Sequence, residues 1–283
     1  MARLETFLRD RSPLDQNQLR RIRELTSDWQ LLADLSFADL ILWVPLRKDF
    51  KSWPTGYVAV AHIRPTTAAT VFPQEVIGEE ISWGSRPRID QALSGAEIIR
   101  DAQPEKSGEL LIKEETIPVI LDEQVIAVIS RHRNAELMRQ PSRLELNYRE
   151  VAHNVFRMVA EGTFPYTEHS ELFDPAVRVG DGLIRLDING VITYASPNAK
   201  SAFNRMGLAG ELEGNNLGEV ARKVSLVKAD AHEEAIEVSL SGKSLRRVEI
   251  ENLGGTIDLM ALPLLAATDR IGAIVLLQNV TEL

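Results

Sequence analysis

The sequence predicts an α+β protein of two domains in tandem, each an antiparallel sheet with flanking helices. Its 283 residues are enough for two domains, because one domain usually has about 100–200 residues. Apolar runs of strand length occur in neighbouring pairs, which is typical of antiparallel hairpins. Segments with an apolar stripe at helical spacing precede and follow these pairs. We place the first domain at residues 1–164, a linker at 165–174 and the second domain at 175–283.

Composition restricts the functions that the chain can have. It contains no cysteine, which excludes disulfides, cysteine-ligated metal centres and every thiol-based mechanism. The formal net charge of −9 opposes nonspecific binding to nucleic acid. No apolar run reaches the roughly 18 residues of a membrane helix, and the charged N-terminus lacks the apolar centre of a secretory signal. We therefore expect a cytoplasmic protein that binds no membrane and makes no direct contact with nucleic acid.

The first predicted element is a helix that begins near Ser12. Ser12 is a suitable N-cap, and Pro13 suits the first helical position. An apolar stripe at 3-4-3 spacing follows it. The stripe has two interpretations that the sequence does not separate, packing within its own domain or a seam between two chains of a homodimer. The stripe consists of Ile22, Leu25, Trp29 and Leu32.

Two strand pairs and two further helices complete the first domain. The predicted strands are rich in β-branched and aromatic residues. The last helix begins with a capping box of Ser142 and Glu145 and carries an apolar stripe, so it can pack beside the first helix on one side of the sheet. We expect strands at 37–46, 56–64, 116–121 and 125–131, and helices at 87–93 and from Ser142 to near Gly162.

The second domain is predicted to open with a hairpin whose turn contains Asn189 and Gly190. Asn-Gly is a strong hairpin signal, because both residues tolerate positive φ. Residues 211–218 are rich in glycine and asparagine and predict a loop. We expect strands at 182–187, 191–196, 244–252, 256–263 and 271–278, and helices at 197–203 and 229–240.

The second domain resembles a PAS domain over residues 174–283. PAS domains often end in an Asp-x-Thr motif, and Asn279 stands here in the place of its aspartate. We expect this domain to transmit a signal, because apolar side chains fill its core, namely Leu183, Ile192, Phe203, Leu259 and Leu276. The resemblance rests on the runs Asp181–Ile184, Asp187–Ile192, Tyr194–Ala199 and Asn279–Leu283.

The first domain resembles a GAF domain over residues 4–164, most clearly at Ile117–Ile120 and Val125–Ile129. The tandem is similar to the sensor region of actinobacterial cytosolic two-component histidine kinases, of the mycobacterial type that signals to an RNA-binding antitermination response regulator. This resemblance implies a homodimer, a response regulator as partner, and a kinase core that uses ATP and Mg²⁺. We expect that core to follow Leu283 in the intact protein.

The sequence contains no complete catalytic or metal-binding motif. A Gly-x-x-x-x-Gly-Lys-Ser/Thr phosphate loop is absent, and no two histidines have the close spacing of metal ligands. His153 lies on the last helix of the first domain, but its neighbours do not match the phosphoacceptor box of a histidine kinase. We therefore expect no catalytic site, no metal and no cofactor in this chain.

A noncovalent small-molecule ligand is the remaining expectation. Arginine pairs with phosphate through two hydrogen bonds, and Trp or His can stack on a base. The GAF resemblance favours a cyclic dinucleotide such as cyclic di-GMP, although the Asn-Lys-x-Phe-Asp-Glu signature of phosphodiesterase GAF domains is absent. The alternative interpretation is that the arginines are solvated and the tryptophans belong to the core. The candidate residues are Trp43, His62, Arg64, Trp83, Arg86, Arg88, Arg131, His132 and Arg133 in the first domain, and Asn215, Asn216 and Arg222 in the second.

Three functional hypotheses follow from these observations. In the first, a signal perceived in the GAF-like domain controls autophosphorylation of a histidine kinase core. In the second, the chain is a non-enzymatic binding or dimerisation module. In the third, the same sensor regulates a different output, such as a cyclic-dinucleotide synthase or a transcription activator. The resemblance to histidine kinases favours the first.

Overall fold

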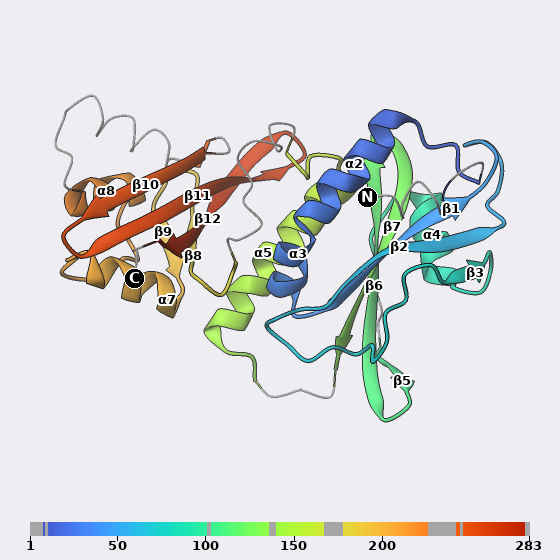
Figure 1. Cartoon of the computed structure of the whole chain (residues 1–283), viewed down its shortest axis with the longest axis horizontal. Helices are drawn as coiled ribbons and strands as arrows, with labels where there is room; N and C mark the ends of the chain where they lie inside the picture. Colours follow the sequence, from blue (N-terminus) through green and yellow to red (C-terminus); the bar gives the residue numbers. More distant parts are fainter. Residues whose placement is uncertain are drawn as a thin grey trace. The chain divides into compact units, whose positions relative to one another are not determined.

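The computed structural model describes residues 8, 11–100, 103–135, 140–166, 178–225, 242–243 and 246–280. It divides the chain into two compact units, Met1–Pro165 and Tyr166–Leu283, each with its own antiparallel sheet (Figure 1). The predicted α+β class is therefore confirmed. No helix within the described residues is both long and apolar enough to cross a bilayer.

The first unit contains a seven-stranded sheet in the order β3-β2-β1-β7-β6-β4, with β5 paired to β6. Helices α3 and α5 pack against each other on one face of the sheet, and α4 covers the other face (Figure 1). The elements are α2 (Gln16–Ser27), α3 (Trp29–Ser36), β1 (Asp39–Leu46), β2 (Gly56–Ile63), β3 (Glu80–Ser82), α4 (Pro87–Gly95), β4 (Ile99–Arg100), β5 (Glu105–Ser107), β6 (Leu110–Leu121), β7 (Gln124–Asn134) and α5 (Arg143–Ala160).

The first helix begins later than the sequence predicts. Asp15, and not Ser12, is the N-cap of α2, because its carboxylate accepts a hydrogen bond from the Gln18 N–H at 2.8 Å. The Gln18 side chain accepts the Asp15 N–H at 3.0 Å and completes a capping box. The predicted stripe continues over α3, and each of its four residues is at most 3% exposed within this chain. The interpretation of this stripe as a dimer seam is therefore wrong, and the packing interpretation is correct.

Helix α5 is fixed at both ends. At its start, the predicted capping box is confirmed, since Ser142 Oγ accepts the Glu145 N–H at 3.1 Å and Glu145 accepts the Ser142 N–H at 2.7 Å. At its end, the buried guanidinium of Arg21 on α2 donates to the Gly162 carbonyl at 2.7 Å and to the Pro165 carbonyl. A cation at a helix C-terminus also interacts favourably with the helix dipole.

Positive φ at both central residues was expected in the β8–β9 turn but occurs in the β6–β7 turn. The β6–β7 turn has positive φ at both central residues, 49° at Asp122 and 62° at Glu123, as a type I′ turn requires. In the β8–β9 turn the residues with positive φ include Gly190 but not Asn189. The Asp187 carboxylate shapes that turn instead, because it accepts the N–H groups of Asn189 and Val191 at 2.8 and 2.9 Å.

The second unit contains a five-stranded sheet in the order β10-β11-β12-β8-β9. One helix within it was not predicted, α8, which begins inside the stretch expected to be a loop. The helix predicted at 229–240 lies outside the described residues. The elements are β8 (Leu183–Leu186), β9 (Ile192–Ala195), α7 (Pro197–Arg205), α8 (Leu217–Val224), β10 (Arg246–Asn252), β11 (Gly255–Ala266) and β12 (Asp269–Asn279).

An apolar cluster fills the space between this sheet and α7 and α8. Ile192, Phe203 and Leu259 belong to it, as predicted. Leu183 and Leu276 are also buried, but they are cross-strand partners on the opposite face of the sheet. Successive side chains of a strand point to opposite faces of its sheet. The neighbours of Leu276 on β12, Val275 and Leu277, belong to the cluster, so Leu276 points to the other face.

Candidate ligand-binding pocket in the first unit

The pleat of β7 separates three residues that the sequence places side by side. Successive side chains of a strand point to opposite faces of its sheet, whereas directly paired residues share a face. His132 pairs with Glu114 and points to the α4 face. Arg131 points to the other face, where its guanidinium lies 5.4 Å from the ring centroid of Phe156 on α5. The predicted nine-residue group therefore does not form one pocket.

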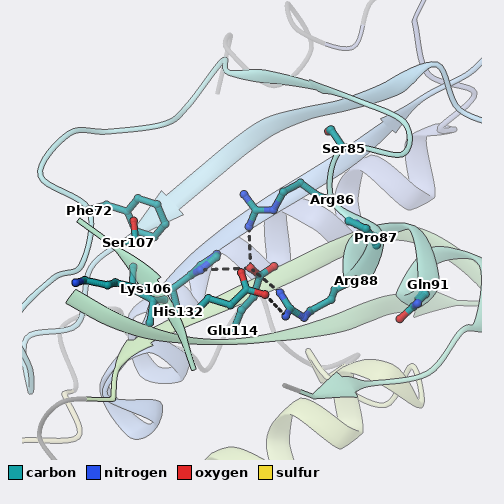
Figure 2. A pocket seen from close by; sticks show the side chains of 12 residues that line it. Phe72, Ser85, Arg86, Pro87, Arg88, Gln91, Lys106, Ser107, Glu114 and His132 are labelled. Carbon is teal, nitrogen blue, oxygen red and sulfur yellow. Dashed lines mark hydrogen bonds and ion pairs between the residues drawn. The ribbon is translucent and has the colours of Figure 1, made fainter. Parts of the chain in front are cut away.

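The α4 face contains a cavity of about 660 Å³ (Figure 2). The turn before α4 and its first turn form one wall, at Ser85–Arg88 and Gln91. The β5–β6 hairpin forms another wall with Glu105–Ser107, Ile112 and Glu114, and Phe72 and His132 complete the lining. Of the nine residues predicted in the first domain, Arg86, Arg88 and His132 line this cavity.

Glu114 is the electrostatic centre of this pocket (Figure 2). Its side chain is 10% exposed, and its Oε2 accepts a hydrogen bond from Arg86 Nη2 at 2.9 Å. The same oxygen lies 3.9 Å from Arg88 Nη1 and 4.0 Å from His132 Nδ1. Arg88 also donates to Glu105 at the pocket rim at 2.5 Å. The carboxylate, on β6, thus gathers two arginines from the start of α4 and a histidine from β7.

His132 belongs to a buried chain of polar groups. Its Nε2 lies 2.8 Å from Ser130 Oγ, and the indole Nε1 of Trp43 donates to the same oxygen at 2.8 Å. The Ser130 hydroxyl hydrogen can then point to Nε2, which leaves the Nδ1–H tautomer facing Glu114. Burial, and then the charge of Arg86, lowers the pKa of His132 to about 3. The imidazole is therefore neutral at physiological pH.

The Ser130–His132–Glu114 series superficially resembles a hydrolytic triad. A nucleophilic serine must reach its substrate, however. Ser130 has no exposed surface, and its oxygen is already occupied by the indole of Trp43. The series therefore organises one side of the pocket and does not supply a nucleophile.

The segment that follows β2 forms a further wall. Asp39, which is fully buried, accepts hydrogen bonds from Thr70 Oγ1 at 2.5 Å and from the Val71 N–H at 2.8 Å. Burial raises the pKa of Asp39, but the neighbouring His62, whose Nε2 lies 3.6 Å from Asp39 Oδ1, and the hydrogen bonds from Thr70 and Val71 outweigh that effect and lower it overall. The Phe72 ring then meets His62 edge-on at 5.4 Å and His132 at 4.9 Å. His62 therefore supports the pocket from behind Phe72.

Six of the nine residues predicted in the first domain do not line the cavity. Trp43 and His62 lie behind its wall, and the other four lie away from it. Arg64 is exposed at the end of β2. Trp83 packs on Tyr57 at 6.1 Å and on Trp53 at 5.3 Å between ring centroids, so it extends the apolar core. Arg131 and Arg133 line a smaller cavity on the opposite face of the sheet. Trp43 is a core residue, as the alternative interpretation had it.

The three candidates in the second domain have structural contacts and do not line one cavity. Asn216 is the N-cap of α8, because its side chain accepts the Gly218 N–H at 2.9 Å. Asn215 donates to the Glu211 carbonyl at 2.8 Å. Arg222 is exposed on α8. These contacts stabilise the loop before α8, so the geometry does not bring the three residues together around a ligand.

Sequence reasoning missed Glu114, Ser130 and Phe72. Glu114 was missed because the strand was expected to start at Thr116, whereas β6 starts at Leu110. The signal was available, since the run Lys113–Glu115 places charge between apolar residues that continue the strand. No group of three metal-ligating side chains occurs among the described residues.

Comparison with known proteins agrees with this architecture. Residues 4–152 match the family model described as the GAF domain of the histidine kinase PdtaS. The chain is 36% identical over its full length to the sensor histidine kinases PdtaS of Mycobacterium tuberculosis H37Rv and of Mycolicibacterium smegmatis. It spans 56% of the length of each of these relatives. A solved structure titled as the sensor region of a sensor histidine kinase is 35% identical, with a TM-score of 0.83 over 99% of this chain and 98% of that one.

The GAF domain and the second α+β unit together align with a solved sensor region along almost the whole chain. The chain is therefore a sensor region of a histidine kinase. The chain belongs to the PdtaS family of sensor histidine kinases.

Proposed function

We propose that this chain perceives a small anionic signal in the α4-face pocket and thereby controls a cytoplasmic two-component histidine kinase. The whole protein would autophosphorylate with ATP and Mg²⁺ and pass the phosphoryl group to a response regulator, as a homodimer. Support comes from membership of the PdtaS family and from the length of the relatives, of which this chain spans 56%.

The observation that carries the pocket assignment is the convergence of Arg86 and Arg88 on a cavity with an aromatic wall. The cavity volume of about 660 Å³ lies within the roughly 300–1,000 Å³ of small-molecule sites. Three cationic side chains, Arg86, Arg88 and Lys106, outnumber the two carboxylates of the lining. Within the described residues, one nitrogen of Arg86 is bound, by Glu114. Its other donors are available to a phosphate.

A cyclic dinucleotide such as cyclic di-GMP is the ligand class that we propose for this pocket. Its phosphates would pair with Arg86 and Arg88, because guanidinium groups bind phosphate oxygens through parallel hydrogen bonds. Phe72, which is partly buried at the pocket, offers an apolar ring to a base. The neutral His132 can hydrogen-bond a base edge without adding charge.

We propose further that the second unit is a PAS domain that transmits the signal. The sequence resemblance over 174–283 and the single five-stranded antiparallel sheet support this assignment. The apolar cluster that fills the space between its sheet and α7 and α8 favours transmission over ligand binding. Ligand binding shifts a protein between two states only if the ligand has different affinities for them.

The experiment is calorimetric titration of the purified chain with cyclic di-GMP. The native chain is expected to bind cyclic di-GMP with one saturable transition, at the α4-face pocket. Arg86→Gln is expected to weaken binding at least about tenfold, because a hydrogen bond to a charged group contributes about 1.5–3 kcal/mol. The matched control is Arg20→Gln, an exposed arginine on α2. Absence of binding, or equal binding by both variants, would remove the pocket assignment.

A further inference from the structure

A second cavity of about 200 Å³ lies on the α5 face of the first sheet. Strands β6 and β7 form its floor, and α5 forms one side. Its lining contains five cationic side chains, Arg100, Lys113, Arg131, Arg133 and Arg149. Such a concentration is unexpected in a chain whose formal net charge is −9.

The carboxylates at this cavity do not balance its cations. Glu114 and Glu115 are the two acidic residues in the lining. Glu114 binds Arg86 on the opposite face. Both oxygens of Glu115 are engaged, one by Arg100 Nε at 2.6 Å and the other by Arg131 Nη2 at 2.8 Å. Glu115 therefore neutralises part of the cluster through both of its oxygens.

Three cations at the cavity lack a carboxylate partner. Lys113, Arg133 and Arg149 make no ion pair within the part of the chain that the structure describes. The Nε atoms of Arg133 and Arg149 are buried and have no hydrogen-bond partner there. Burial, and then the neighbouring charge of Arg149, lowers the pKa of Arg133. Buried donors that are unsatisfied and mutually repelling cost free energy unless an anion joins them.

We propose that this cavity is a second binding site of the protein, which takes a small phosphate-type anion. The occupant is inorganic phosphate or the phosphoryl group of a small metabolite. Arginine donors arranged around a common space match the oxygens of a phosphate. The volume lies below the roughly 300–1,000 Å³ of sites for larger molecules, so it suits one phosphoryl group.

The position of the site connects its occupant to α5. Arg149 lies on α5, and Arg131 stacks over Phe156 of the same helix. Arg133 and Lys113 are paired across β7 and β6. A phosphate held by these side chains bridges the sheet to the helix that precedes the second unit. This site is separate from the α4-face pocket, because its arginines alternate with His132 along β7.

The test is calorimetric titration of the whole chain with inorganic phosphate at constant ionic strength. We expect saturable binding, weakened at least about tenfold by Arg149→Gln or Arg133→Gln. Arg20→Gln, an exposed arginine on α2 that lines neither cavity, is the matched control and is expected to bind phosphate as the native chain does. Titration with glycerol phosphate separates the two sources, since tighter binding than phosphate indicates a metabolite and weaker binding indicates the free ion.

A melting curve distinguishes a binding site from a purely structural cluster. Without phosphate, Arg149→Gln is expected to melt at or above the native temperature, because it relieves repulsion, and to lose the rise that phosphate causes in the native chain. Lys113→Gln, on the strand, provides the same test should Arg149→Gln fail to fold. Absence of saturable phosphate binding, or equal loss in the Arg20 control, would overturn the proposal.

Discussion

The two units differ in what their sheets bury. In the first unit, Asp39, Glu114, Glu115 and His132 are each at most 8% exposed. In the second, Asp258 is the one buried carboxylate among the described residues. Buried charge costs free energy and is compensated only by specific partners. The sheet of the first unit therefore carries more of this cost than the sheet of the second.

Tryptophan fluorescence can follow the first unit by itself. All four tryptophans of the chain, Trp29, Trp43, Trp53 and Trp83, lie before residue 165. Far-UV circular dichroism follows both units. Comparing the two signals during unfolding therefore separates effects on the first unit from effects on the second.

The largest expected effect is that of Asp39→Asn. The amide can replace one acceptor oxygen, but its NH₂ group then meets either the Thr70 hydroxyl or the buried Val71 N–H. We expect a loss of about 2–4 kcal/mol in the free energy of unfolding. Urea titration followed by tryptophan fluorescence measures it.

Two matched variants sharpen this prediction. Asp49→Asn removes a carboxylate with similar contacts to Lys51 and Ser52, but at an exposed site, and should leave the free energy of unfolding close to that of the native chain. Asp258→Asn breaks the pair with the half-exposed Arg247 and should cost about 1 kcal/mol. If Asp258→Asn cost as much as Asp39→Asn, the contrast between the units would not hold.

The second effect concerns pH. The unfolded chain takes up a proton at His132 below about pH 6.5, whereas the folded chain does so only near the folded pKa of about 3. Stability contributed by neutral His132 is therefore complete above pH 6.5 and falls by about 1.4 kcal/mol per unit as the pH decreases. His132→Gln should flatten this slope in urea titrations between pH 7 and 4.5. An unchanged slope in His132→Gln would contradict the assignment.

The smallest effect is expected at the N-cap of α8. Asn216→Ala should destabilise the second unit by about 1 kcal/mol, because the Gly218 N–H loses its acceptor. Asn216→Ser keeps a capping oxygen and should retain most of that stability. Thermal melting followed by circular dichroism measures both. Unchanged melting of Asn216→Ala would mean that the side chain is not needed for the fold and would return it to the ligand candidates.

Sequence reasoning predicted the elements with strong local signals. The strand pairs followed from β-branched and aromatic runs, and α5 followed from its capping box and stripe. It failed where two signals competed, as at Ser12 and Asp15, which both suit an N-cap. It also missed α8, whose asparagine cap was interpreted as part of a loop.

The candidate site was only partly accessible from sequence. Arg86, Arg88 and His132 were identified by their chemistry, and the cavity brings them together. Arg131 and Arg133 were grouped with them because they lie at the end of a predicted strand, where a pocket mouth was expected, whereas the pleat places both on the other face of the sheet. The charged run Lys113–Glu115 marks Glu114 in the sequence, but its position beside His132 follows from the strand register, which depends on the β6–β7 turn.

The alternation along β7 has a thermodynamic consequence. Arg131, His132 and Arg133 place the two cavities on opposite sides of a single backbone segment. If occupancy of one cavity changes the affinity of the other by some factor, linkage requires the reverse effect to have the same factor. Bound phosphate would then change the concentration of signal molecule at which the protein responds. The signal molecule would in turn change the affinity for phosphate.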